Sequence, residues 1–592
     1  MTNPLLPRPA RTAGRVLVWA LLALLVLTAA AAVWLGIRGY LAYSHLRAAE
    51  SAARSLAADI GDPASVVERI PAVSADTAAA RQLTSDPIWE AAEGLPWVGE
   101  QLAAVATVAA AVDDVVGSAL EPLVGIASDF SVDALRPVDG RFDLSGFAEM
   151  HTAAAASADQ IARATTSLEN VDRGALLPPL ASSVDDVAAL LDMVHTGADA
   201  VSRATALMPA MLGQDGPRDY LVVFQNNAEW RSLGGIVGAM AMIHTEGGSI
   251  SLTAQASSSD FTKYEDPVLD IGDLTSVAGV KPAQFIQNAT QAPSFPLAAR
   301  ISQEMWARET GVHVDGVLSL DPVALSYLLA ATGPVTLPTG DVLTADNAVQ
   351  LLLNDVYQRY ERPADQDAFF EAAAASVFDA LASGSGDPTA LVSALVQAGE
   401  ENRLLLWNAD ETDQAVLDGT TLQGLLPVTD AEQTAFGVYV NDGTGSKMDY
   451  YMGLDTGVTW CSDTEGSPDA LLTVRLRDEA PADAASLPSY ITGNGTFGVP
   501  AGITRTLTYL YLPAGSSVVS SSATGGSSTP GFGTGSDQGR TVLIWATDLA
   551  PGEEATATVR VQTPFTPSLV AETTPVLPGK SGTVEATCAV TG

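Results

Sequence analysis

The segment Arg218–Leu252 constrains the fold of this chain more than any other part of the sequence. It reads RDYLVVFQNNAEWRSLGGIVGAMAMIHTEGGSISL, which predicts three strands joined by a polar turn and a tight turn. Apolar residues occupy successive positions of Tyr220–Phe224, as in a central strand covered on both faces. Gly247 and Gly248 suit the positive φ of a hairpin turn. The segment therefore predicts the central sheet of an α/β domain.

The polar turn after the first strand holds the leading candidate site. Ligands of α/β sheets commonly bind at strand ends. Arg231 precedes Gly234 and Gly235, and a guanidinium beside glycine-exposed N–H groups suits an oxyanion such as a phosphate. The alternative is an internal ion pair of Arg231 with Glu229 or Asp219. The spacing alone leaves both interpretations open.

The size and charge of the chain limit its class. With 592 residues, it is long enough for about three or four folded units. Its net charge of −40 argues against nucleic acid as a partner, because phosphate backbones require clustered Lys and Arg side chains.

An uncharged apolar run, residues 16–37, predicts a transmembrane helix. As a helix it would measure ~33 Å, about the thickness of the hydrocarbon core. The preceding tail, residues 1–15, contains three arginines and no acid: Arg8, Arg11 and Arg15. This favours a cytoplasmic tail and a large extracytoplasmic part anchored in the cell membrane. The alternative is a cleaved signal peptide, for which Ala29–Ala32 offers small residues.

The rest of the chain divides into three regions and predicts a multidomain α+β protein. Residues 38–215 are alanine-rich with helical periodicity, which predicts a helical stalk or bundle. Residues 216–450 alternate strands and helices and predict an α/β domain with a covered central sheet. Residues 451–592 predict an all-β, sandwich-like domain. Within it, we expect the Gly/Ser-rich stretch Gly515–Gly539 to form a long hairpin loop.

One strand–helix unit has clear boundary signals. The strand ends at Leu320, Asp321 is placed to cap the helix, and Pro322 suits its first turn. The helix is expected over Val323–Thr332, and Gly333 suits the position after its end.

The two cysteines, Cys461 and Cys588, both lie in strand-like sequence near the C-terminus. Two cysteines cannot complete a tetrahedral zinc site by themselves. In a region outside the cytosol they predict a disulfide.

The chain resembles the bacterial DUF4012 family, a family of unknown function. The resemblance is carried by Leu83–Gly99, Tyr220–Gly238, Phe285–Gly311, Gly316–Val335 and Tyr490–Gly515. Together these segments span most of the part beyond the apolar run. The resemblance implies a membrane-anchored bacterial envelope protein and no particular activity.

A more distant resemblance is to the LytR–CpsA–Psr family, and it falls on residues 216–450. Those enzymes transfer glycopolymers from polyprenyl-pyrophosphate carriers to peptidoglycan, with Mg²⁺ and pyrophosphate-binding arginines. Their Arg-Ser-Asp-Thr motif is similar to Arg231-Ser232, although Leu233-Gly234 follows here. Their basic segment is similar to Arg359–Arg362.

This second resemblance implies a set of candidate ligands. The candidate phosphate-binding residues are Arg231, Gly234, Gly235, Arg359 and Arg362. The candidate Mg²⁺ ligands are Asp321, Asp365 and Asp367, since Mg²⁺ prefers hard oxygen ligands. The alternative is structural: Asp321 serves as a helix cap, and the others form a solvated charged stretch.

Two functional hypotheses follow. The preferred one is a non-catalytic, membrane-anchored module of the cell envelope that binds wall polymer or a partner protein. The alternative is a phosphotransferase-like enzyme that acts on polyprenyl-pyrophosphate-linked glycopolymers, with Mg²⁺ as its cofactor.

Overall fold

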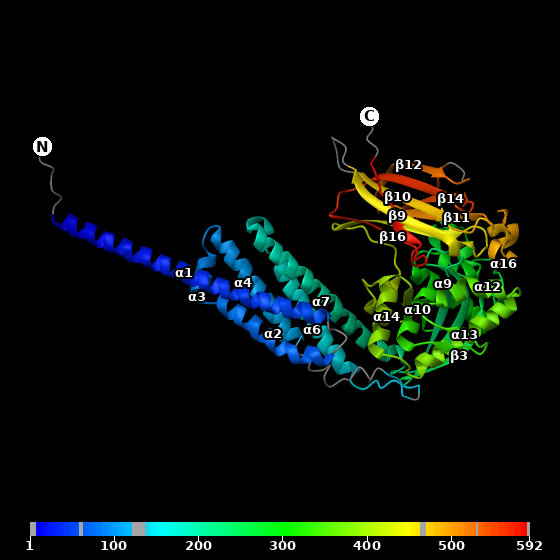
Figure 1. Ribbon diagram of the computed structural model, residues 1–592, viewed down its shortest axis with the longest axis horizontal. Helices are drawn as coiled ribbons and strands as arrows, with labels where there is room; N and C mark the ends of the chain where they lie inside the picture. The colour runs from blue at the N-terminus through cyan, green and yellow to red at the C-terminus, as the bar shows by residue number, and fades with distance from the viewer. Residues whose placement is uncertain are drawn as a thin grey trace. The chain divides into compact units, whose positions relative to one another are not determined.

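The computed structural model describes residues 8–58, 63–120, 136–138, 140–461, 469–527 and 531–588. The chain forms two compact units (Figure 1), a helical unit and an α+β unit. The helical unit consists of Met1–Val132 and Ser145–Met208, and the α+β unit of Asp133–Leu144 and Pro209–Gly592. The mixed α+β class is confirmed. Residues 1–7 of the predicted cytoplasmic tail lie outside the described residues.

The helical unit is built from long helices joined by turns. They are α1 (Arg8–Ala58), α2 (Pro63–Thr84), α3 (Pro87–Glu93), α4 (Val98–Val115), α6 (Phe147–Glu169) and α7 (Pro178–Met211). A π-helical turn, Val116–Leu120, extends α4. Val108, Ile161 and Leu191 are buried in one core cluster. The helices α4, α6 and α7 therefore pack side by side, as their apolar periodicity predicts.

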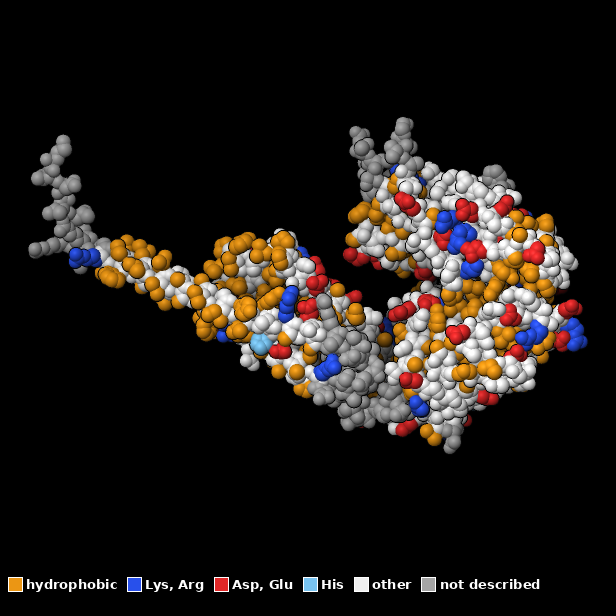
Figure 2. Space-filling view, in the orientation of Figure 1, with side chains coloured by type: hydrophobic (Ala, Val, Ile, Leu, Met, Phe, Trp, Pro, Cys, Tyr) orange, Lys and Arg blue, Asp and Glu red, His pale blue; other side chains and the backbone are white. Residues whose placement is uncertain are grey.

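The first helix contains the predicted membrane segment and continues beyond it without a break. Apolar side chains cover the N-terminal part of α1 and face outward (Figure 2). The segment Arg15–Ala52 is long and apolar enough to cross a membrane, and so is Val98–Leu120, which is partly buried in the unit. The predicted N-terminal helix of spanning length is confirmed by length and composition.

The α+β unit contains the predicted central sheet, in the strand order β3-β2-β1-β4-β7. The strands are β1 (Arg218–Asn226), β2 (Ile236–Glu246), β3 (Ser249–Ser257), β4 (Gly316–Leu320) and β7 (Leu404–Asn408). Strand β1 lies in the centre, antiparallel to β2 and parallel to β4. Gly247 and Gly248 have φ of 53° and 85° in the predicted hairpin turn. The three-strand prediction is therefore confirmed.

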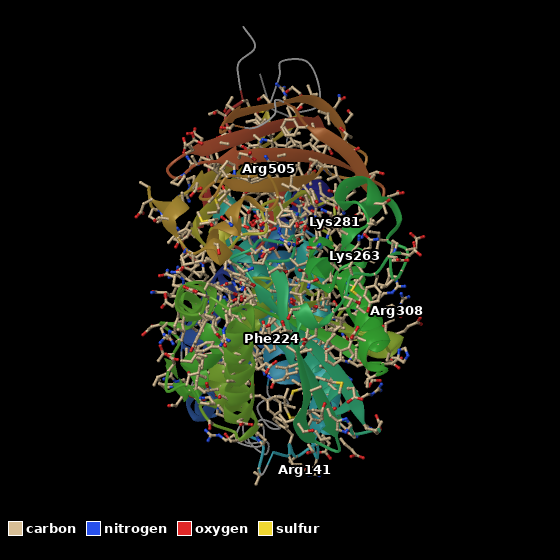
Figure 3. The ribbon with its side chains drawn as sticks, turned by 90° about the vertical axis from the view of Figure 1, so that its right-hand side faces the viewer. Arg141, Phe224, Lys263, Lys281, Arg308 and Arg505 are labelled. Carbon is tan, nitrogen blue, oxygen red and sulfur yellow. A yellow bond between two sulfur atoms is a disulfide. The ribbon has the colours of Figure 1, made fainter. Side chains whose placement is uncertain are left out.

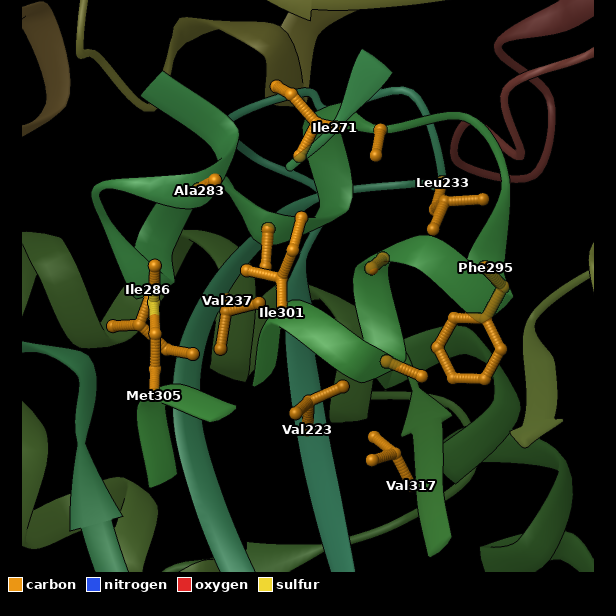
Figure 4. Packing of buried hydrophobic residues seen from close by; sticks show 14 of the residues in the cluster. Val223, Leu233, Val237, Ile271, Ala283, Ile286, Phe295, Ile301, Met305 and Val317 are labelled. Carbon is orange, nitrogen blue, oxygen red and sulfur yellow. The ribbon is translucent and has the colours of Figure 1, made fainter. Parts of the chain in front are cut away.

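Helices cover the sheet on both faces, as the apolar run in β1 predicts. One cluster combines Val223 of β1 and Val317 of β4 with Phe295 and Ile301 of α9 (Phe295–Thr310; Figure 4). Helices α10 (Pro322–Thr332) and α13 (Pro363–Ala382) also contact the sheet. The shorter helices are α8 (Thr275–Ala278), α11 (Ala348–Gln350), α12 (Val356–Arg359), α14 (Pro388–Glu400), α15 (Glu411–Val416) and α16 (Ser489–Thr492).

The strand–helix unit at Asp321 matches its prediction. Asp321 caps α10, and its Oδ1 accepts a hydrogen bond from the Ala324 amide at 2.8 Å. Pro322 opens the helix, and Gly333 follows it at φ 87°. The short strands β5 (Val335–Thr336) and β6 (Val342–Leu343) pair after it.

Two five-stranded sheets follow and face each other across a second core. The first has the order β12-β15-β10-β9-β17 and the second β13-β14-β11-β8-β16. Their bounds are β8 (Gln433–Asp442), β9 (Met452–Cys461), β10 (Asp469–Asp478), β11 (Thr504–Tyr511), β12 (Ser517–Gly525), β13 (Gly533–Asp537), β14 (Arg540–Leu549), β15 (Glu554–Gln562), β16 (Ser568–Thr573) and β17 (Ser581–Thr583). Val438, Leu472 and Trp545 are among the side chains buried between them.

Two expectations for this region need correction. Strand β8, which the sequence boundary at 450/451 assigns to the α/β domain, pairs with β11 and β16 of the sandwich. The stretch Gly515–Gly539 is not one long loop, because it contains β12 and β13. Serine- and glycine-rich sequence has a weak propensity for strands. Here β12 pairs along β15 and β13 along β14, and this pairing outweighs the weak strand propensity.

The central sheet and the sandwich share side chains in a continuous core. The buried rings of Tyr439 and Tyr511 lie on the sandwich sheet and belong to the same cluster as Phe295 and Val223. Phe224 of the central sheet and Arg505 of the sandwich are marked in Figure 3. The α/β and all-β regions therefore form one compact unit rather than two separate ones.

A disulfide joins Cys461 at the end of β9 to Cys588, with Cα atoms 5.6 Å apart. The predicted bond is confirmed. It ties the last described residue of the chain to the sandwich.

We expect Cys461→Ser to lower the free energy of unfolding by about 4–5 kcal/mol. The bond closes a loop of 127 residues, and chain-entropy arguments give this magnitude for such a loop. Chemical denaturation measures the change, and added reductant should no longer affect the variant. Alkylation of both thiols in the native, unreduced protein would contradict the bond.

Candidate functional site

The polar loop between β1 and β2, residues 227–235, lies where the central sheet meets the sandwich. Trp230 is completely buried and belongs to the core cluster of the two sandwich sheets, not to that of its own sheet. A large aromatic side chain contributes much of the apolar area of such a contact. The loop therefore connects the two halves of the α+β unit.

Backbone hydrogen bonds fix the loop from the sandwich side. The Trp230 amide donates to Asp449 Oδ2 at 2.7 Å, and the Trp230 carbonyl accepts from the Asp442 amide at 2.9 Å. The Ser232 amide donates to Asn441 Oδ1 at 3.0 Å, and the Ser232 carbonyl accepts from Thr574 Oγ1 at 2.9 Å. The backbone polar groups of Trp230 and Ser232 are thus satisfied by β8, by the 3-10 turn after it and by the residue after β16.

Arg231 is paired inside the protein. Its Nη2 donates to Glu229 Oε1 at 3.0 Å, and its Nη1 donates to the Trp230 carbonyl at 2.8 Å. Its Nε and Nη2 donate to Asn288 Oδ1 at 3.1 and 3.0 Å. Only 9% of the side chain is exposed. Of the two alternatives, the structure contains the ion pair with Glu229, whereas Asp219 bonds His244.

Glu229 lies between two cations, because Lys447 Nζ donates to its second carboxylate oxygen. Burial opposes ionisation of Glu229, but Lys447 and Arg231 together hold its pKa below the ordinary value. Burial also opposes the charge of Lys447, and Glu229 raises the pKa of that amine well above its usual range. Glu229 and Lys447 are therefore both charged near neutral pH.

Gly234 and Gly235 stabilise the turn through hydrogen bonds within the protein. The Gly234 amide donates to the Arg231 carbonyl at 2.8 Å, and the Gly235 amide donates to Gln225 Oε1 at 2.8 Å. A Cβ at Gly235 would stand 2.3 Å from the Asn226 backbone, so only glycine fits there. Both N–H groups that were expected to face an anion already have protein acceptors.

Two further buried carboxyl groups face the same cluster. Burial, followed by the charge of Glu229, raises the pKa of Asp442 to about 6. Burial and the neighbouring Asp442 raise the pKa of Asp449 well above its ordinary value, and Asp449 Oδ1 has no hydrogen-bond partner among the residues that the structure describes. With Arg231 and Lys447 charged, a third ionised carboxylate would give the cluster a net negative charge. Protonation of Asp449 removes this excess.

The other candidate arginines bond elsewhere. Arg359 pairs with Asp341 at 2.8 Å, and Arg362 pairs with Asp365 at 2.7 Å. Among the interactions described for these residues, they share no partner with Arg231. No described contact therefore links Arg359 or Arg362 to the turn that holds Arg231, Gly234 and Gly235, and phosphate binding stays a prediction.

The candidate Mg²⁺ ligands also have protein partners. Asp321 Oδ2 accepts from Arg403 Nη1 at 2.7 Å and from Asn227 Nδ2 at 3.0 Å, and Asp367 accepts from Ser259 Oγ at 3.3 Å. Among the residues that the structure describes, no group of three or more His, Cys, Asp or Glu is placed to hold a metal ion. These carboxylates do not fit a Mg²⁺ site, and the cofactor stays a prediction.

Residues 215–357 match the DUF4012 family. The family is described as a protein of unknown function, so the match assigns no activity. It confirms the DUF4012 resemblance over β1, the polar loop, α9 and α10. The segments Leu83–Gly99 and Tyr490–Gly515 lie outside it. No curated protein and no solved structure matches the chain, and the LytR–CpsA–Psr resemblance is not shown.

Sequence reasoning identified Arg231 and Glu229 but missed Trp230, Lys447 and Asp449. One signal was available: Trp230 is a large apolar residue between two charged ones in a turn, which predicts a buried anchor. Nothing local pointed to Lys447, because 218 residues separate it from Glu229.

We expect Arg231→Ala to lower the free energy of unfolding by about 3 kcal/mol, because it removes one of the two cations paired with the buried Glu229 carboxylate and the guanidinium donors to Asn288 Oδ1. The matched control is Arg362→Ala, whose side chain is 80% exposed; its effect should stay within about 0.5 kcal/mol. Urea denaturation measures both. Equal transitions for the two variants would show that Arg231 has no structural role.

The raised pKa of Asp449 predicts a pH effect. A carboxyl group with a raised folded pKa contributes stability that is complete below its unfolded pKa and is lost as pH rises through the folded value. The protein should therefore be more stable at pH 5 than at pH 8. Asp449→Asn should reduce this difference by about 1.4 kcal/mol for each pKa unit removed. Burial also raises the pKa of Asp442 and Asp478 to about 6 and that of Glu572 to about 7, so part of the pH dependence of stability remains in both proteins. If the free energy of unfolding of Asp449→Asn changed with pH as much as that of the parent protein, the raised pKa of Asp449 would be contradicted.

Proposed function

We propose that this chain is a membrane-anchored, extracytoplasmic module of the cell envelope that binds wall polymer or a partner protein without catalysing a reaction. The observation that supports this most directly is the internal pairing of Arg231 with Glu229 and Asn288. A phosphate-binding arginine must present donors to its ligand. Here the guanidinium instead fastens the loop that joins the central sheet to the sandwich.

The anchor and the disulfide support the proposed location. Helix α1 is long and apolar enough to cross a membrane. The Cys461–Cys588 bond suits an oxidising compartment outside the cytosol.

An exposed sheet edge supports the binding role. Strand β12 (Ser517–Gly525) stands at the end of its sheet, and nearly all of its residues are exposed. Val518 and Val519 are among them. An edge strand offers unpaired N–H and C=O groups to an extended chain, as in strand addition.

The test separates this proposal from the phosphotransferase alternative. The full-length chain, in detergent, is incubated with Mg²⁺ and a polyprenyl diphosphate. We expect no rise in the unfolding temperature and no phosphate release, because Arg231 is buried and its Nε, Nη1 and Nη2 all donate to protein acceptors. Arg362→Ala, which folds normally on our expectation, should behave like the parent.

Saturable stabilisation by the diphosphate, with phosphate release that is reduced in Arg362→Ala, would establish the enzyme and overturn the proposal.

The binding role is tested with the same preparation. Cosedimentation with isolated peptidoglycan sacculi supports wall-polymer binding, and cross-linking to one envelope protein in cells supports a partner. Failure of both would also overturn the proposal.

A further inference from the structure

A turn of the helical unit is held beside the end of the predicted membrane segment. Arg38 directly follows the apolar run of α1, and its Nε lies 2.8 Å from the Leu83 carbonyl and 2.8 Å from Asp86 Oδ2. A Cβ at Gly39 would lie 3.6 Å from the Trp89 ring. The turn between α2 and α4, which contains α3, is therefore fixed at the level where α1 leaves the apolar run.

This turn exposes large apolar side chains instead of burying them. Ile88, Leu95, Trp97 and Val98 are all exposed, and Trp97 is the most exposed of them at 63%. Trp97 also has a φ of 65°, a conformation that is uncommon for a residue other than glycine. An ordinary soluble turn would place polar residues here.

A second turn lies at the same end of the unit. Gln101 of α4 donates through Nε2 to the Ala175 carbonyl at 2.9 Å and accepts from the Leu177 amide at 2.9 Å. Leu177 is exposed as well. The turn before α7 thus adds to the apolar surface beside Trp97, and Figure 2 shows apolar side chains at the end of the helical unit nearest the apolar part of α1.

We propose that these two turns rest in the interface of the bilayer that α1 crosses, with Trp97, Leu95 and Leu177 at the boundary of the hydrocarbon. This inference rests on the proposed membrane anchor. Contiguous exposed apolar surface marks a binding site, and tryptophan is enriched at the membrane–water interface. Helix α1 exposes Trp34 and Tyr40 on either side of Arg38, six residues or ~9 Å apart along its axis.

Charge favours a neutral bilayer as the partner. Glu90 and Glu100 are exposed next to the turn, and burial together with Glu90 raises the pKa of Glu93. The charge of Arg38 is balanced by Asp86. The contact is therefore apolar rather than an attraction to anionic headgroups, and it orients the helical unit relative to the membrane.

The test places one fluorophore at the turn of the full-length chain. Cys461 and Cys588 form a disulfide, so a thiol-reactive, environment-sensitive dye labels only an introduced cysteine. Trp97→Cys is the test variant. Met193→Cys is the matched control, since Met193 is 64% exposed and lies on α7, ~22 Å along the helix from Pro178.

In phosphatidylcholine vesicles, we expect the dye at position 97 to shift its emission to the blue and to be quenched by lipids that carry a shallow nitroxide. The dye at position 193 should show neither effect. Trp97→Asn provides a second measurement, because asparagine tolerates positive φ. It should reduce the quenching of intrinsic tryptophan fluorescence by brominated phosphatidylcholine.

The outcomes separate this inference from the anchor itself. If alkaline carbonate extracts the full-length chain from vesicles, the anchor and the proposed function fail together. If the chain is retained but the dye at position 97 is not quenched by lipid, this inference alone is overturned. If a second, nitroxide-labelled copy of the chain quenches the dye at position 97 and nitroxide lipid does not, the inference is also overturned. The turn would then form an interface between copies of the chain.

Discussion

The α+β unit depends on one buried carboxylate between two cations. Glu229 and Arg231 belong to the loop that leaves the central sheet, and Lys447 belongs to the segment after β8 of the sandwich. Buried charges are tolerated when each is paired and hydrogen-bonded. Trp230, between the two loop charges in sequence, fills the sandwich core. The same short loop therefore supplies both the buried tryptophan and two of the three charged groups that join the central sheet to the sandwich. This explains why it is the most distinctive stretch of the sequence.

The portion that matches DUF4012 ends at this junction. Tyr357, the last matched residue, accepts a hydrogen bond from Asn226 at the end of β1. Its ring stacks on Tyr490 with centroids 5.5 Å apart, and Lys447 Nζ lies 5.8 Å from its centroid. The matched residues thus obtain part of their core from residues beyond 357. Taken alone, they would leave Trp230 and Tyr357 without the partners that bury them.

Local signals in the sequence predicted local structure well. The three strands around Gly247, the cap at Asp321 and the membrane-length helix follow from periodicity and backbone chemistry within a few residues. The partner of Glu229 could not be predicted in this way, because Lys447 is distant in sequence and only the assembled sheets bring it near. Strand β12 was missed for a related reason: its serines acquire strand structure from pairing with β15. The arginine in the polar loop suggested an anion site because the sequence shows donors but does not show which acceptors occupy them.

The last strands of the chain complete sheets that begin more than a hundred residues earlier. Strand β16 adds in parallel to β8, β17 adds in parallel to β9, and Thr574 holds the loop at Ser232. A polypeptide that crosses a membrane from its N-terminus delivers these segments last. With the topology proposed above, the halves of the unit can close only when translocation is nearly finished, and until then the tryptophan-containing loop is open to chaperones and proteases beyond the membrane.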